Sequence, residues 1–176
     1  MNLPNKLTLA RVIVVPFFII SYILGMFWIA LILFIGASVT DFFDGKIARQ
    51  RNLVTNFGKI MDPLADKVLV YSALCLFIEA GIIDAWMLII ILAREFAVAG
   101  MRTVAASDGR VLAAGMSGKI KTALQMFAVP IMILGQALVG TPIILQIGYY
   151  IFLASLFMTL YSGVEYIIKN KDVFSM

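Results

Sequence analysis

Six long apolar stretches, separated by short links, constrain the fold of this chain more than any other feature. A hydrocarbon core about 30 Å thick requires roughly 20 residues of helix. Each stretch has about that length, and the stretches cover residues 7–24, 27–49, 57–80, 85–106, 115–138 and 142–168. Hydrophobic residues make up 62% of the chain, its mean hydropathy is +1.02, and charged residues make up only 14%, against about 25% in soluble domains. We therefore expect an all-α integral membrane protein: a six-transmembrane-helix bundle, folded as one catalytic domain over residues 1–176.

The links between these stretches predict antiparallel neighbours in a compact bundle. They lie at Gly25, at residues 81–84 and at residues 140–141, and Pro142 suits the first turn of the last helix. With both termini in the cytoplasm, all 14 Lys and Arg residues fall on the inner side or in the inner parts of helices. We therefore predict a multi-pass protein of the cytoplasmic membrane with both termini in the cytoplasm.

Several classes of chemistry are excluded by composition. The chain has no histidine, which rules out acid–base catalysis by histidine and the usual zinc sites. Its single cysteine, Cys75, cannot form an intrachain disulfide and is read as a small buried hydrophobic residue. The net charge of +4 is modest, and we expect membrane lipids as neighbours and no nucleic-acid partner.

Acidic residues concentrate where the second and third stretches approach the cytoplasm. Four of the chain's ten acidic residues lie here, at Asp41, Asp44, Asp62 and Asp66. Asp41 and Asp44 share one helical face, and Asp62 and Asp66 share another. At 1.5 Å per residue Asp41 and Asp66 each lie about 21 Å from the outer ends of their helices, so the two acidic faces meet at a common depth. We expect them to line a polar cavity that opens to the cytoplasm, because ionisable residues at that depth avoid lipid.

Small residues continue both acidic faces, at Gly45, Ala48 and Gly58. Carboxylates are hard oxygen ligands for Mg²⁺ or Mn²⁺, and small neighbours let a phosphorylated group approach the backbone. A single aspartate here would more often face water or cap a helix. Four aspartates on two faces favour a site for divalent cations, since unpaired carboxylates in an apolar setting would repel one another.

The residues from Asp41 to Asp66 follow the pattern D-x-x-D-G-x-x-A-R, eight further residues, then G-x-x-x-D-x-x-x-D. This pattern resembles the signature of the CDP-alcohol phosphatidyltransferase family, with every fixed position and the spacer present. The resemblance implies two divalent ions, Mg²⁺ or Mn²⁺, held by Asp41, Asp44 and Asp62. It makes Asp66 the general base and a further metal ligand. The implied nucleotide-binding residues are Asp41, Gly45, Ala48, Arg49 and Gly58.

Basic residues in and after the fourth stretch suggest the acceptor. Arg94-Glu95 and the segment Gly118-Lys-Ile-Lys-Thr122 resemble the bacterial phosphatidylglycerophosphate synthases of that family. Arg94 either pairs structurally with Glu95 or Glu165, or points at the cavity and holds an anionic acceptor. The candidate acceptor-phosphate residues are Arg94, Arg102, Arg110, Lys119 and Lys121, although positive-inside topology explains some of these cations.

The resemblance implies transfer of the phosphatidyl group from CDP-diacylglycerol to sn-glycerol 3-phosphate, with CMP released, by a homodimer. An acceptor that is itself a phosphate requires such cations, whereas serine or free inositol does not. The same chemistry with inositol phosphate, inositol or serine is the first alternative. A small transporter or channel with an acidic ion pathway is the alternative from another class, because intramembrane carboxylates also mark ion routes.

Overall fold

The computed structural model describes residues 3–50, 56–113, 115–138 and 140–173, and it describes the backbone alone at 3–8, 41–50, 56–63, 66 and 172. In these parts the chain forms six α-helices and one short 3₁₀ helix, with no strand. The α-helices are α1 (Leu3–Ile23), α2 (Phe27–Gln50), α3 (Asn56–Glu79), α4 (Ala85–Ser107), α5 (Met116–Ala137) and α6 (Pro142–Lys169), followed by η1 (Lys171–Val173).

Most helix bounds fall within one residue of the six predicted stretches. The largest difference is at the start of α1, which begins at Leu3 instead of residue 7. Pro4 stands in its first turn, where the missing N–H costs no hydrogen bond, so the polar segment before the apolar stretch can continue the helix. Pro142 likewise begins α6, as predicted.

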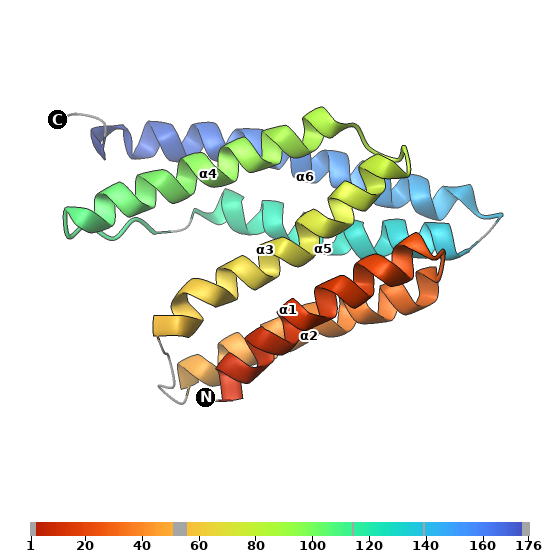
Figure 1. The fold of residues 1–176 in the computed structure, drawn as a ribbon. Helices are drawn as coiled ribbons and strands as arrows, with labels where there is room; N and C mark the ends of the chain where they lie inside the picture. The colour runs from red at the N-terminus through yellow and green to blue at the C-terminus, as the bar shows by residue number, and fades with distance from the viewer. Residues whose placement is uncertain (1–2, 51–55, 114, 139, 174–176) are drawn as a thin grey trace.

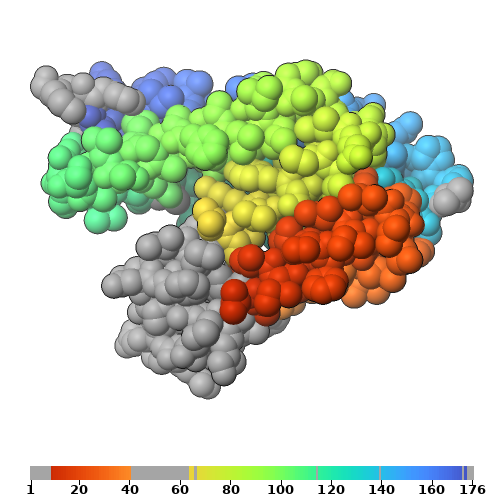
Figure 2. Space-filling view, in the orientation of Figure 1, coloured from red at the N-terminus to blue at the C-terminus, as the bar shows by residue number. Residues whose placement is uncertain are grey.

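The helices run lengthwise with their links divided between two ends (Figure 1). Both termini and the α4–α5 link lie at the left end of the view, and the α1–α2, α3–α4 and α5–α6 links lie at the right. Helix α5 packs against α6 and α2, α1 packs against α2 and α3, and α4 packs against α6. On the face that Figure 2 presents, α3 lies between α1 and α4.

Glycine makes two of the turns at the right end possible. Gly25 has a φ of 72° and Gly81 a φ of 69°, in the left-handed region that costs other residues free energy. After α1 the Gly25 N–H donates to Tyr22 O at 2.9 Å and the Met26 N–H donates to Ser21 O at 2.9 Å. The same pair of bonds ends α3 at Gly81. This arrangement provides hydrogen-bond donors for carbonyl groups in the last turn of each helix, and it reverses the chain within a few residues.

The apolar core lies toward the end of the bundle that contains these tight turns. Its fully buried aromatic side chains are Phe18, Phe34, Phe77 and Phe152. The Tyr22 ring packs against Phe18, Phe27 and Phe77, and its hydroxyl donates to Gln136 Oε1 of α5 at 2.6 Å. Buried polar side chains lie mainly in the other half of the bundle: Ser117, Lys121, Gln125, Ser155, Thr159 and Ser162.

The outer surface is unusually apolar. Large aliphatic and aromatic side chains are exposed along most helices, among them Ile13, Phe17, Ile32, Trp86, Phe96, Phe127, Ile147, Phe157 and Val164. Cys75 of α3 is exposed as well, so the expectation that it is buried was wrong: it lies on the outer face of its helix. Two helices in the described part of the chain, α5 and α6, are long and apolar enough to cross a membrane, and shorter apolar helical segments cover residues 9–23 and 27–40. Charge inside and hydrocarbon outside is the arrangement that a lipid environment favours.

Candidate functional site

The acidic signature lies on the two helices that approach residues 51–55 from either side. Asp41, Asp44, Gly45, Ala48 and Arg49 belong to the last turns of α2, and Gly58, Asp62 and Asp66 belong to the first turns of α3. Their side chains and surroundings are outside the part of the molecule that the structure describes. The roles predicted for these residues in metal binding, nucleotide binding and catalysis therefore stay predictions.

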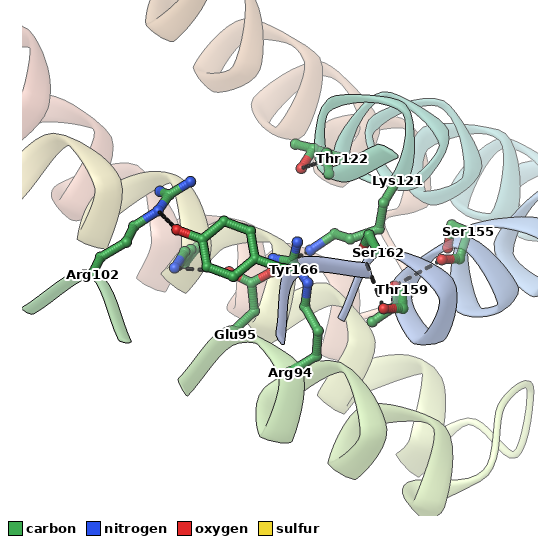
Figure 3. Close-up of polar contacts among 11 residues, drawn as sticks. Arg94, Glu95, Arg102, Lys121, Thr122, Ser155, Thr159, Ser162 and Tyr166 are labelled. Carbon is green, nitrogen blue, oxygen red and sulfur yellow. Dashed lines mark hydrogen bonds and ion pairs between the residues drawn. The ribbon is translucent and has the colours of Figure 1, made fainter. Parts of the chain in front are cut away.

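Next to Asp66 in the chain, Lys67 joins a cluster of charged side chains around Glu95. Lys67 Nζ lies 2.9 Å from Glu95 Oε2, and Arg94 Nη1 lies 3.2 Å from Glu95 Oε1. Lys121 Nζ donates to Glu95 Oε1 as well. Figure 3 shows Lys121 reaching from α5 toward Glu95 and Arg94 of α4. The carboxylate thus links α3, α4 and α5.

This charge cluster is shielded from solvent to different degrees. The side chain of Lys121 is 5% exposed, that of Glu95 11%, that of Arg94 14% and that of Lys67 40%. Three cations surround one carboxylate, so the cluster as described carries a net charge of two positive units. A buried excess of positive charge is unfavourable unless an anion offsets it.

Two glycines make room for Arg94. A Cβ atom at Gly118 of α5 would lie 3.1 Å from Arg94 Nη2, and one at Gly163 of α6 would lie 3.0 Å from Arg94 Cγ. The Arg94 side chain therefore passes between α5 and α6 where their backbones leave space. The sequence analysis offered Glu95 or Glu165 as a structural partner of Arg94, and the structure pairs Arg94 with Glu95. A role in holding an acceptor stays a prediction.

One face of α5 carries both Lys121 and Gln125, which are four residues apart and buried. With Lys67, Tyr71, Glu95 and Thr122 they line a pocket of about 50 Å³ between α3, α4 and α5, and Val70 and Met126 add apolar side chains to its lining. Thr122 donates its hydroxyl to Gly118 O at 3.1 Å, within its own helix.

The structure separates the five basic residues that the sequence grouped. Arg94 and Lys121 share Glu95, but Arg102 Nε donates to Tyr166 Oη at 3.2 Å and its guanidinium lies 5.6 Å from the centre of that ring. Lys119 is exposed on α5, and Arg110 is exposed in the link after α4. Positions 119 and 121 cannot share a helical face, because they are only two residues apart.

A second polar contact joins α5 to α6. Glu165, the other partner considered for Arg94, accepts hydrogen bonds from Ser117 of α5 and from Lys169 one turn along α6. Buried hydroxyls on α6 donate to its own backbone, as Thr159 does to Ser155 O at 2.7 Å (Figure 3). Hydroxyls bonded in this way need no other partner inside an apolar bundle.

Lys67 and Gln125 were missed by the sequence analysis. Lys67 directly follows the last aspartate of the signature, and its charge was assigned to topology. Gln125 offered one usable signal, a polar residue four positions after Lys121 in an otherwise apolar stretch. The arrangement around Glu95 is suited to binding an anion, because cationic and amide donors outnumber the acceptors beside them.

Comparisons with known proteins identify the family. A family model described as CDP-alcohol phosphatidyltransferase matches residues 1–161. A Bacillus subtilis (strain 168) protein named CDP-diacylglycerol–glycerol-3-phosphate 3-phosphatidyltransferase is 44% identical, covering 97% of this chain and 96% of its own length. Proteins of the same name from Rickettsia felis and Rickettsia prowazekii are 39% and 40% identical, each covering 98% of this chain and 97% of its own length.

The match includes the helices that carry the signature and the helices that form the cluster around Glu95. It also agrees with the signature pattern that the residues from Asp41 to Asp66 follow. The chain therefore belongs to the CDP-alcohol phosphatidyltransferase family.

Proposed function

We propose that this protein transfers the phosphatidyl group of CDP-diacylglycerol to sn-glycerol 3-phosphate, giving phosphatidylglycerophosphate and CMP. The observation that carries the proposal is the match over nearly the whole chain to relatives named for this reaction, up to 44% identical. Membership in the family supports the reaction class, and the cations around Glu95 support an acceptor that is itself an anion.

The catalytic residues we propose are the four aspartates of the signature. Helices α2 and α3 are in contact, and a donor set made only of carboxylate oxygens suits Mg²⁺ or Mn²⁺. Asp41, Asp44 and Asp62 would hold two such ions, with Asp66 as a further ligand. Divalent cations so held would neutralise the pyrophosphate of the donor and the charge on the departing CMP.

The reaction itself is a displacement at phosphorus. The hydroxyl oxygen of the acceptor attacks the phosphorus of the phosphatidyl group, the bond from that phosphorus to the CMP oxygen breaks, and CMP leaves. Asp66 accepts the hydroxyl proton as the new P–O bond forms. Gly45, Ala48 and Gly58 leave room for the cytidine nucleotide, and Arg49 and Asp41 complete its binding site.

The acceptor phosphate would bind on the cationic side of the cluster. Arg94 and Lys121 are the two residues of the predicted acceptor set that the structure brings to one carboxylate. Phosphate is bound most strongly by charge-assisted hydrogen bonds. Arg102, Arg110 and Lys119 would attract the substrate toward the site or contact anionic lipids.

The membrane arrangement we propose has six spanning helices, with both termini and the active site at the cytoplasmic side. The supporting observations are the apolar outer surface, the two helices long enough to span, and three links at one end that contain no Lys or Arg. Lipid tails would then stay beside the helices while the headgroup reacts at the polar end. The resemblance also supports a homodimer.

CMP release from CDP-diacylglycerol by the purified protein in detergent tests the proposal directly. Mg²⁺ or Mn²⁺ is supplied, and sn-glycerol 3-phosphate, inositol phosphate, inositol and serine are tested singly. We expect metal-dependent release with glycerol 3-phosphate alone. Release only with a different alcohol would contradict the proposed acceptor but would support the proposed reaction class. No release from folded protein with any acceptor would contradict the enzymatic proposal and favour a transporter.

A further inference from the structure

A buried donor in the pocket beside Glu95 has no partner in the described structure. Gln125 is 4% exposed, and its Nε2 atom makes no hydrogen bond. Gln125 lines the pocket with Lys67, Glu95 and Lys121. A buried amide without a partner is unfavourable, so its position in the lining of a pocket points to a ligand that accepts a hydrogen bond there.

Both oxygens of the Glu95 carboxylate are occupied. Glu95 Oε1 accepts from Arg94 and Lys121, and Glu95 Oε2 accepts from Lys67. The pocket therefore offers cationic and amide donors, with a net charge of two positive units from the three cations and one carboxylate. A ligand that satisfies this pocket carries oxygen acceptors and negative charge.

The size of the pocket limits how much of a ligand can enter. Its volume is about 50 Å³, far below the roughly 300–1,000 Å³ of pockets that enclose a whole drug-sized ligand. The pocket therefore receives only a small polar part of a ligand, such as the oxygens of one terminal group. The rest of the ligand must lie outside, and the most exposed cation of the lining is Lys67.

We propose that Gln125 is a specificity-determining residue, whose Nε2 donates to a phosphate oxygen of the acceptor while Lys67 and Lys121 balance the charge. The proposal rests on the proposed function and adds the residue that selects a phosphorylated acceptor. A phosphate monoester carries about −1.5 to −2 at pH 7, which matches the excess positive charge. Serine or free inositol leaves that excess in place.

The test compares Gln125→Leu and Gln125→Glu with the wild-type protein in the CMP-release assay. Loss of a hydrogen bond to a charged group corresponds to about a 10- to 100-fold effect. We expect the KM for glycerol 3-phosphate to rise by that factor in Gln125→Leu, and further in Gln125→Glu, whose carboxylate repels phosphate. The KM for CDP-diacylglycerol should stay within about twofold, since this interaction is local.

Inorganic phosphate supplies a second readout that a structural role would not change. It should compete with glycerol 3-phosphate in the wild-type protein, and its inhibition constant should rise in parallel with the KM in both variants. The matched control is Gln136→Leu, which removes a partly buried amide from the C-terminal end of the same helix. Its two KM values should equal those of the wild type.

Lys67→Gln tests the same pocket if the Gln125 variants do not fold, because Lys67 is 40% exposed and tolerates replacement better. It should raise the KM for glycerol 3-phosphate and the inhibition constant of phosphate, whereas Lys169→Gln, which removes a lysine paired with Glu165, should change neither.

Folded variants of the pocket that keep wild-type values for both would overturn the role of Gln125. Wild-type protein that releases no CMP with glycerol 3-phosphate would instead contradict the proposed function.

Discussion

Gly163 of α6 lies directly against the side chain of Arg94 of α4, so that a Cβ atom at position 163 would be 3.0 Å from Arg94 Cγ. Few Cβ atoms in proteins approach another atom so closely. The absence of a side chain on α6 thus lets Arg94 reach past that helix toward Glu95. A glycine on α6, far from Arg94 in the sequence, thus contributes to the position of that charge.

Gly163→Ala should therefore displace Arg94. We expect the KM for glycerol 3-phosphate to rise about tenfold, the effect of losing one hydrogen bond to a charged group, with a smaller effect on the KM for CDP-diacylglycerol. The control is Gly36→Ala on α2, where an added Cβ meets nothing within 4 Å. Equal kinetics for both variants would show that Arg94 does not serve the acceptor.

Gly135→Ala should separate α5 from α6. A Cβ at this position would lie 2.5 Å from Leu145 N, a backbone atom that cannot move away alone. Overpacking of this kind costs about 1–3 kcal/mol and sometimes more. We expect a clear fall in the thermal midpoint of the protein in detergent, whereas Gly36→Ala should leave it unchanged or raise it slightly. A midpoint equal to that of the wild type would contradict the close α5–α6 contact.

Glu95→Gln should destabilise the fold by removing the carboxylate that three cations share in the described structure. Breaking a buried ion pair by removing one partner costs about 3–5 kcal/mol, and the exposure of Lys67 reduces that cost here. The thermal midpoint should fall, and added inorganic phosphate should recover part of the loss because it supplies the missing negative charge. Glu165→Gln, which removes a more exposed carboxylate, should have a smaller effect.

Asp66→Asn tests the proposed general base. We expect kcat to fall by about 10²- to 10⁴-fold, the usual contribution of such a group, while the thermal midpoint and binding of CDP-diacylglycerol stay close to wild type. Asp84→Asn, at the link between α3 and α4, should keep wild-type kcat. Near-normal turnover in Asp66→Asn would assign the base to another residue.

Chelation should abolish turnover reversibly. Treatment with excess EDTA removes divalent ions. We expect CMP release to stop, because without these cations the aspartate carboxylates would repel the negatively charged pyrophosphate. Addition of Mg²⁺ or Mn²⁺ should restore it. Asp41→Asn should shift the metal concentration that gives half-maximal rate to a higher value, since one charged ligand is lost. Full activity in EDTA would exclude the proposed metal requirement.

Much of the fold could be predicted from hydrophobic length alone. Six helices were expected and six are present among the described residues, and the tight links at Gly25 and Gly81 were located correctly. Backbone groups in hydrocarbon must bond within their own helix, which makes the relation between an apolar stretch and a helix nearly unambiguous. The polar start of α1 was placed less well, because polar residues at a helix end carry no comparable signal.

The grouping of the basic residues was beyond sequence reasoning. Arg94, Arg102, Arg110, Lys119 and Lys121 were predicted to act together, yet only Arg94 and Lys121 share a carboxylate in the described structure. Arg102 instead lies against Tyr166. Spacing along a helix fixes which residues share a face, but it does not say which neighbouring helix that face meets.

The sequence by itself determined the helical architecture, the family and the proposed chemistry, since these depend on residue type and on spacing within single helices. Only the tertiary structure decided that Lys67, Glu95 and Lys121 meet across three helices, that Gly118 and Gly163 make room for Arg94, and that Gln125 faces a pocket. These contacts join residues far apart in the chain. They follow from how the helices cross and pack, which local patterns leave open.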